Sequence, residues 1–259
     1  MLEAQVHDAS CFATLTYDDE NIPEGGSLDP RDLQLSFKRL RRTGVKFRYF
    51  AVGEYGDATN RPHYHVAYYG FRCTNGGSHY RRSGMACCAT CHQVQETWGK
   101  GHVRLGELNT ASAQYIGGYV TKKMTAKDDA RLMGRHPEFA RMSLRPGIGA
   151  LAMHDVASTL LEHSLDTKMA DVPSTLLHGG RARPLGRYLT RKLREAIGHD
   201  PAAPQSTIDA VAAQLQPLRL AARADSEAPS LREQIVKANQ GKLIQLEHKQ
   251  RIYKKARPL

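Results

Sequence analysis

Three features are missing or scarce in this sequence, and each absence narrows its class. No apolar run approaches the roughly 18 residues that a transmembrane helix needs, so a membrane-spanning protein is not expected. Residues 1–8 lack the basic block followed by an apolar block that marks a signal peptide, which disfavours secretion. Cysteine is scarce: there are 5, an odd number, and all but Cys11 fall between residues 73 and 91. That pattern fits a reducing cytosol, with a metal site or buried thiols, better than a disulfide scaffold.

Acidic residues are scarce relative to basic ones. Asp and Glu total 26 against 37 Lys and Arg, which gives a formal net charge of +11. Such an excess in a compact protein is typical of one that binds a polyanion, and the alternative is a basic protein without such a partner. The 259 residues, 41% of them hydrophobic, suffice for one large domain or for a medium domain with an appendage.

The first 127 residues are predicted to form a mixed α/β unit. Four segments rich in β-forming residues indicate strands, and the second and third should pair as a hairpin. Asp29 followed by Pro30 predicts a helix start, and Asn109 or Thr110 caps another helix that runs to about Met124. This order of elements predicts an α+β fold with a ferredoxin-like antiparallel sheet and helices on one face. The strands are expected at 11–17, 46–54, 63–71 and 101–108.

Three regions are expected along the chain. Residues 1–127 form the core, which carries a cysteine-rich insertion at 72–96. Residues 128–197 contain short segments broken by Pro and Gly, and we expect a helical or irregular extension there. After a linker at 198–206, residues 207–259 are predicted to be a basic helical region, so the C-terminal extension should be mostly helical.

His63 and His65 are the first candidates for a chemical site. Side chains two apart on a strand project from the same face, so both imidazoles can bind one divalent cation while Tyr64 turns away. Glu54 ends the preceding strand, and the hairpin can bring its carboxylate beside the histidines as a third ligand; Asp57 is the nearer rival. Such a set leaves coordination positions open, as a catalytic metal site requires. The alternatives are structural histidines and a solvated strand-end carboxylate.

Tyr115 and Tyr119 lie four apart on the second predicted helix, so both phenols can point to one place. Lys122 and Lys123 follow on the same side, and a nearby ammonium group lowers the pKa of a tyrosine. These four residues are catalytic candidates, because a metal opposite them can polarise a phosphate for attack. Taken alone, the pattern also fits half-buried packing tyrosines beside lysines that extend to solvent.

Together these motifs resemble those of the HUH endonucleases, and in particular the replication initiators of microvirus-type single-stranded DNA phages. Phe12–Tyr17 is similar to the family's first motif, a strand beside the site, and Arg61–Val66 is similar to its metal motif. Tyr115–Lys123 is similar to its two-tyrosine motif, and the three occur in the family's order. Residues 137–149 also resemble microviral initiators.

The resemblance implies a reaction. A tyrosine attacks a phosphodiester at the replication origin and leaves a 5′-phosphotyrosine link and a 3′-OH that primes synthesis, and the second tyrosine later rejoins the strand. Mg²⁺ or Mn²⁺ is the implied ion. Lys122 stands three residues after Tyr119, whereas Gly118 stands three after Tyr115, so we expect Tyr119 to be the better activated nucleophile. The implied partners are origin DNA, single-stranded at the nick, and the host replication helicase and polymerase, in the host bacterial cytoplasm.

The cysteine cluster indicates a possible zinc site. Cys88 and Cys91 form a CxxC pair, and Cys73 stands upstream, where related initiators can carry a second pair. One ligand of a four-cysteine site is therefore missing, and the alternative to zinc is a set of buried thiols. The candidates for the missing ligand are His79, Cys87 and His92.

Basic residues near the end of the first helix and within the insertion are the candidate phosphate contacts. Those on the helix have another explanation, since cations also complement a helix C-terminus. The candidates are Lys38, Arg39, Arg41, Arg42, Arg81 and Arg82, together with the basic C-terminal helix.

Three other functions would share some of these features. A plasmid-type initiator, relaxase or transposase would use the same chemistry. A non-enzymatic nucleic-acid-binding protein would keep the histidines and the zinc-like loop for structural reasons. A metallohydrolase that uses bound water would remain active without either tyrosine.

Overall fold

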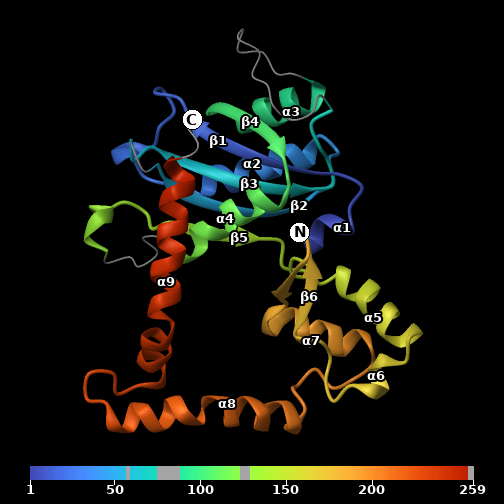
Figure 1. Cartoon of the computed structure of the whole chain (residues 1–259). Coiled ribbons are helices and arrows are strands. Elements are labelled where there is room, and N and C mark those ends of the chain that lie inside the picture. Colours follow the sequence, from blue (N-terminus) through green and yellow to red (C-terminus); the bar gives the residue numbers. More distant parts are fainter. Residues whose placement is uncertain (57–58, 75–87, 123–128, 256–259) are drawn as a thin grey trace. The chain divides into compact units, whose positions relative to one another are not determined.

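The chain divides into two compact units, Met1–Thr159 and Leu160–Leu259 (Figure 1). The computed structural model describes residues 1–56, 59–74, 88–122 and 129–255, and at 119–122 and 250–255 it describes the backbone alone.

A five-stranded antiparallel sheet forms the centre of the first unit, with the strand order β4-β1-β3-β2-β5. β1 alternates partly buried and buried residues along its whole length, as a strand covered more tightly on one face does. The predicted α+β class, the antiparallel sheet and the helical C-terminal region are confirmed. The strands are β1 (Ser10–Tyr17), β2 (Arg48–Tyr55), β3 (Pro62–Tyr69), β4 (Gly101–Glu107) and β5 (Phe139–Met142).

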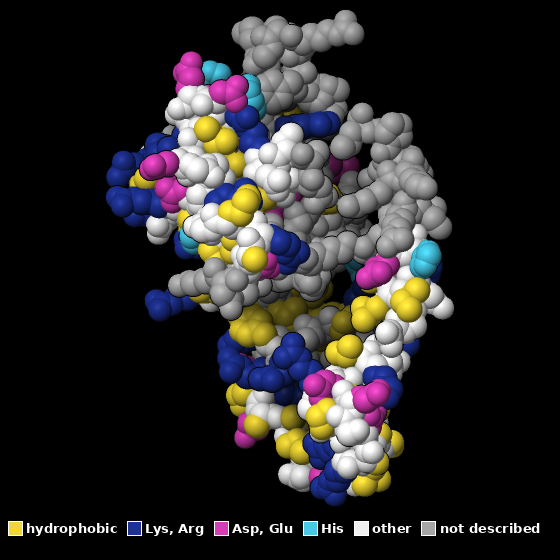
Figure 2. Space-filling view, turned by 90° about the vertical axis from the view of Figure 1, so that its left-hand side faces the viewer, with side chains coloured by type: hydrophobic (Ala, Val, Ile, Leu, Met, Phe, Trp, Pro, Cys, Tyr) yellow, Lys and Arg dark blue, Asp and Glu magenta, His cyan; other side chains and the backbone are white. Residues whose placement is uncertain are grey.

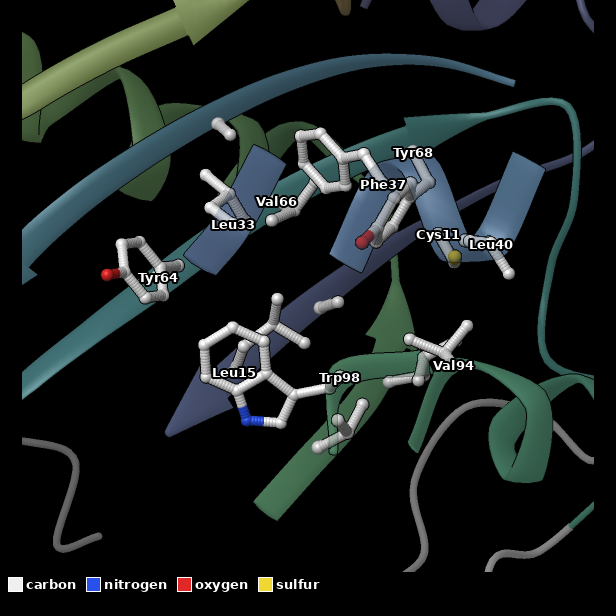
Figure 3. Packing of buried hydrophobic residues seen from close by; sticks show 14 of the residues in the cluster. Cys11, Leu15, Leu33, Phe37, Leu40, Tyr64, Val66, Tyr68, Val94 and Trp98 are labelled. Carbon is white, nitrogen blue, oxygen red and sulfur yellow. The ribbon is translucent and has the colours of Figure 1, made fainter. Parts of the chain in front are cut away.

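Helix α2 (Pro30–Arg42) packs on one face of this sheet. It begins where the sequence predicts, because the Asp29 carboxylate accepts a hydrogen bond from the Arg31 backbone N–H and Pro30 occupies the first turn. Its apolar side chains recur at helical spacing and are buried against β1 and β3, where Phe37 lies beside Tyr68 with ring centroids 5.8 Å apart (Figure 3). The buried side chains of α2 in this core are Leu33, Phe37 and Leu40.

Helix α3 (Ala89–Trp98) covers the same face beside α2. Trp98 is fully buried, and its indole Nε1 donates to the backbone oxygen of Thr16. The Arg39 guanidinium crosses from α2 and donates to the backbone oxygens of Thr97 (2.7 Å) and Trp98 (3.0 Å). These bonds satisfy carbonyls at the end of α3 that its own helix leaves without partners.

Helix α4 (Thr110–Lys122) packs against the opposite face, so the prediction that helices cover only one face is wrong. Ile116 of α4 is buried in a second apolar cluster that contains Ala67 and Tyr69 of β3. Alternation along β3 explains the difference: Tyr64 and its i+2 neighbours face α2, whereas Ala67 and Tyr69 face α4. Because both sets include apolar residues, both faces of the sheet need a cover.

The predicted hairpin of β2 and β3 is confirmed, with strand ends one or two residues from their expected positions. β5 was not predicted, because its four residues are too few to show an alternating pattern. It pairs with β2, and Phe139 lies opposite Gly53. A Cβ atom on Gly53 would lie 2.7 Å from the Phe139 ring, so only glycine lets this ring pack on the sheet.

Short elements complete the first unit. The buried carboxylate of Glu3 in α1 (Leu2–Gln5) accepts hydrogen bonds from the Arg48 side chain and from the Gly149 backbone N–H, and so ties the N-terminus to β2 and to a distant loop. The remaining elements are the 3₁₀ turns η1 (Glu24–Gly26) and η2 (Ala130–Leu132), and α5 (Ala152–Glu162), which runs into the second unit.

The second unit combines a short hairpin with helices. Two hydrogen bonds of 2.7 Å from Arg194 and one from Thr207 reach the Asp171 carboxylate, and they lower its pKa to about 2. No helix in the described part of the chain is both long and apolar enough to cross a membrane. The elements are α6 (Leu165–Lys168), β6 (Thr175–His178), β7 (Arg181–Pro184), α7 (Gly186–Ala196), α8 (Gln205–Ala224) and α9 (Leu231–Lys255).

Phe37→Ala should destabilise the first unit by about 3–5 kcal/mol, because a buried ring surrounded by other aromatic rings is replaced by a cavity. Urea unfolding followed by the fluorescence of Trp98, the single tryptophan, measures this loss. Leu144→Ala is the control, since Leu144 is 74% exposed and its loss should leave the midpoint unchanged. Equal midpoints for Phe37→Ala and the natural protein would contradict the described core.

Candidate functional site

Glu54, His63 and His65 come together on the α4 side of the sheet. The register of the hairpin places Glu54 directly opposite His63, and His65 follows on the same face. Glu54 Oε1 lies 2.7 Å from His63 Nε2 and 2.8 Å from His65 Nε2. One ligand atom from each of the three residues lies within 4.8 Å of the others. Asp57, the rival carboxylate, lies outside the described residues.

Further hydrogen bonds fix both imidazole rings. His63 Nδ1 donates to the backbone oxygen of Arg61 at 3.0 Å, and His65 Nδ1 lies 3.0 Å from Thr14 Oγ1. A neutral His63 that donates through Nδ1 has a lone pair at Nε2, which then faces a carboxylate oxygen. Two acceptors at 2.7 Å repel unless a proton or a cation lies between them. Two imidazoles and a carboxylate held in this way fit a divalent metal ion.

The Glu54 carboxylate is charged at neutral pH. Its residue is only 2% exposed, and burial raises the pKa of the carboxyl group. Hydrogen bonds from His63 and His65 outweigh that effect and lower the pKa to about 2. The group is therefore in the ionised form that metal binding requires.

Tyr115 brings a phenol to the same place. Asn109 caps α4 by accepting hydrogen bonds from the backbone N–H groups of Ala111 and Ser112, both at 3.0 Å, which confirms one of the two predicted caps. Tyr115 Oη lies 3.5 Å from His65 Nε2, and the two rings meet edge to face with centroids 5.1 Å apart. Tyr115 is 47% exposed, so a large substrate can reach its hydroxyl group.

The other helix candidates are described only in part. The backbone of α4 continues through Tyr119 to Lys122, which puts Tyr119 about one turn beyond Tyr115. The side chains of Tyr119 and Lys122, and all of Lys123, lie outside the described residues.

Two basic residues of β4 share this face and were missed by the sequence reasoning. The pairing of β1 with β4 places His102 opposite Thr16 and Arg104 opposite Thr14, and both β4 side chains are exposed. Arg104 therefore adds a cation two strands away from His65. The available signal was their i, i+2 spacing on a predicted strand, but the order of strands was needed to place them beside the histidines.

The structure separates the basic residues at the end of α2. Arg39 is held by the carbonyls of α3, and the Arg41 guanidinium lies over the Phe47 ring, 4.5 Å from its centroid. Lys38 and Arg42 are exposed, and Figure 2 shows several groups of Lys and Arg side chains on the face that it presents. Arg81 and Arg82 lie outside the described residues.

Three cysteines converge at the start of α3. Cys73 Sγ lies 3.7 Å from Cys88 Sγ and 3.4 Å from Cys91 Sγ. Burial raises the pKa of Cys88, but hydrogen bonds from Thr74 and from the Cys91 backbone N–H lower it further, to about 5. The thiolate is the form that binds metal, and three sulfur donors suit zinc.

The fourth position of the cysteine cluster lies elsewhere than in these three residues. His79 and Cys87 are outside the described residues, and the exposed His92 ring lies 3.6 Å from Glu96 on its own helix. Cys11 is buried in the core, and burial raises the pKa of its thiol.

The segment that contains β1 through α4 matches a known family. Residues 10–124 match the family model described as replication-associated protein ORF2. This stretch includes Glu54, His63, His65 and Tyr115. Over this segment the fold and the site are therefore those of a chain similar to replication-associated proteins.

Particular relatives come from phages. The chain is 32% identical over 136 residues to replication-associated protein VP4 of Bdellovibrio phage phiMH2K, covering 49% of this chain and 43% of that protein. It is 32% identical over 155 residues to replication-associated protein ORF2 of Spiroplasma virus 4, covering 53% and 45%, and 29% identical over 211 residues to replication-associated protein ORF4 of Chlamydia phage 1, covering 77% and 49%.

These matches confirm the resemblance to the replication proteins of microviruses. The chain spans slightly less than half the length of these relatives, between 43% and 49%. No solved structure matches it.

Thr14→Val should weaken Mn²⁺ binding about 10-fold or more, because the substitution removes the hydroxyl that orients the His65 ring. Isothermal titration calorimetry with MnCl₂ measures the affinity. Thr16→Val is the matched control on the same strand and face, since the Thr16 hydroxyl makes no hydrogen bond with any residue that the structure describes. Equal weakening by both variants would argue against a metal held by His65.

Proposed function

We propose that this protein is a rolling-circle DNA replication initiator: a metal-dependent HUH-type endonuclease and strand transferase that nicks the origin and later rejoins it. One observation carries the proposal. The Tyr115 hydroxyl lies 3.5 Å from His65 Nε2, at the cluster that Glu54 and His63 complete, so a nucleophile and a metal-ligand set meet at an exposed site. The net charge of +11 and the phage replication-associated relatives support it.

In the proposed reaction, the Oη atom of a tyrosine attacks the phosphorus of an origin phosphodiester. The phenol gives up its proton, the bond from phosphorus to O3′ breaks, and O3′ takes up a proton to become the 3′-OH that primes synthesis. The 5′ end stays linked to the tyrosine. After a second cut by the other tyrosine, a 3′-OH attacks the first phosphotyrosine, which releases the phenol and closes the strand.

The residues divide this work between them. Glu54, His63 and His65 would hold Mg²⁺ or Mn²⁺, which polarises the scissile phosphate when bound. Tyr115 presents its hydroxyl beside His65, and Tyr119 follows on the same helix with Lys122 and Lys123 placed to favour its phenolate form. Both tyrosines are candidates for the first attack. Arg104, on the same face of the sheet, would contact the DNA backbone.

The remaining assignments follow from this role. We propose that a structural Zn²⁺ joins Cys73 to the start of α3 through Cys88 and Cys91, with a fourth ligand from outside the described residues. The proposed partners are origin DNA, single-stranded at the nick because an active site must reach the scissile phosphate, and the host helicase and polymerase. The proposed location is the cytoplasm of the host bacterium.

The double variant Tyr115→Phe/Tyr119→Phe should form no covalent protein–DNA adduct, because both nucleophilic oxygens are removed while both rings remain. The assay mixes the protein with MnCl₂ and a labelled single-stranded origin oligonucleotide, and denaturing electrophoresis detects the adduct. Each single variant, tested alone, identifies the tyrosine that attacks first. Tyr188→Phe, on an exposed tyrosine of the second unit, should form the adduct as the natural protein does.

Two outcomes would contradict the proposed activity. Cleavage that persists in the double variant would indicate a metallohydrolase that uses bound water. Tight binding of the oligonucleotide by the natural protein, with neither adduct nor cleavage, would indicate a non-enzymatic nucleic-acid-binding protein.

Cys73→Ser and Cys91→Ser should each reduce the zinc content of the purified protein well below one ion per chain, because each removes a thiolate from the cluster. Mass-spectrometric metal analysis measures the content. Cys11→Ala removes a buried thiol outside the cluster and should retain the ion. A natural protein that binds no zinc after refolding with the metal would show that the cluster holds only thiols.

A further inference from the structure

A second basic site lies on the sheet face opposite to the candidate metal centre. A groove of about 470 Å³ runs between α2 and the edge strand β5, and we call it the α2–β5 groove. α2 packs on the face that Tyr64 occupies, whereas His63 and His65 lie on the α4 face, so the groove is separate from the tyrosine site. Among the residues that line it are Asp29, Arg31, Gln34, Leu35, Lys38 and Arg141.

The cations of this groove have no anionic partner within the described part of the chain. Arg31, Lys38 and Arg141 are exposed, and no Asp or Glu in that part forms an ion pair with them. Arg141 lies over the Phe139 ring, with its guanidinium carbon 5.4 Å from the ring centroid. The lining carboxylate, Asp29, already accepts a hydrogen bond of 2.7 Å from the backbone at the start of α2. The groove therefore carries an excess of positive charge that its own residues do not neutralise.

The spacing of the cations indicates a polymer rather than a single small anion. Arg31, Lys38 and Arg42 lie at i, i+7 and i+11 on α2, which places all three on one side of the helix. At 1.5 Å per residue, the row from Arg31 to Arg42 is about 16 Å long. One phosphate ion occupies only a fraction of that length, whereas a DNA strand presents several phosphates along it.

The lining of the groove also distinguishes between forms of DNA. Proteins that bind single strands provide aromatic side chains on which the bases stack. The groove is lined by charged, amide and aliphatic side chains, with no aromatic residue among the described residues that line it. A straight row of cations on a helix is suited to the regular backbone of a duplex, which is read through its phosphates.

We propose that the α2–β5 groove binds the phosphate backbone of double-stranded DNA, separately from the strand that is cut at the tyrosine site. The identification of the polyanion as DNA rests on the proposed function. Arg31, Lys38 and Arg141 contact the phosphates, and Arg42 extends the row. The protein thereby holds duplex DNA on one face of its sheet and a single-stranded nick site on the other.

The test measures the binding of a labelled duplex oligonucleotide, without any unpaired region, by fluorescence anisotropy at several KCl concentrations. The triple variant Arg31→Ala/Lys38→Ala/Arg141→Ala should bind about 10-fold or more weakly at low salt. Its plot of log K against log[KCl] should be less steep by about 3, one for each lost phosphate contact. The triple variant Arg181→Ala/Arg183→Ala/Arg187→Ala removes the same charge from the second unit and should lose much less affinity.

Equal loss in both triple variants would show that affinity follows net charge alone, and unchanged binding by the groove variant would also overturn the proposal. Displacement of the duplex by polyglutamate of equal charge, at equal concentration, would instead identify an acidic-peptide site. Unchanged fluorescence of Trp98 and an unchanged urea midpoint verify that the groove variant is folded.

A second assay separates this proposal from the proposed function. The groove variant should form the covalent adduct with a short single-stranded origin oligonucleotide as the natural protein does, because its tyrosines and metal ligands are intact. Loss of the adduct in the groove variant alone would place these cations at the tyrosine site and overturn the proposal. Absence of the adduct in the natural protein would contradict the proposed function, and the duplex measurement would still decide the groove.

Discussion

The register between β2 and β3 is the constraint on which the candidate site depends. It sets Glu54 opposite His63, so that one carboxylate oxygen reaches the Nε2 atoms of both histidines. A shift of one residue would move the carboxylate to the other face of the sheet, because side chains alternate along a strand. The neighbouring strand β1 is fixed by the same sheet and supplies Thr14 to His65. The chemistry therefore rests on backbone pairing more than on any single side chain.

Packing on the far face of the sheet holds the histidine strand in place. Tyr64 stands between the two histidines but points the other way, where its hydroxyl donates to the backbone oxygen of Asp29 at 2.8 Å and bonds to Tyr17 at 2.8 Å. Tyr17 in turn donates to the buried carboxylate of Asp32, which pairs with Lys100. This network joins the start of α2 to the central strands. The residue between two candidate ligands thus has a structural reason to be large and to carry a hydroxyl group.

The two faces of the sheet carry different kinds of positive surface. On the α4 face, Arg104 and His102 of β4 lie in line with the histidines, beside a half-exposed tyrosine. On the α2 face, the cations are arranged in a row along a helix and have no aromatic neighbour in the groove lining that the structure describes. The first arrangement suits a reacting phosphate and the second suits a regular backbone, so a single sheet can serve two segments of one long polyanion.

Local patterns in the sequence determined a substantial part of this description. The alternation of a strand put His63 and His65 on one face, the hairpin brought Glu54 to them, and the Asp29–Pro30 pair predicted the start of α2. These features depend on residues close together in the chain. Only the tertiary structure decided that α4 covers the second face, that Arg39 is held by α3, and that Arg141 joins Arg31 and Lys38. Such contacts depend on the order of strands and on side-chain packing between distant segments, which no local period in the sequence encodes.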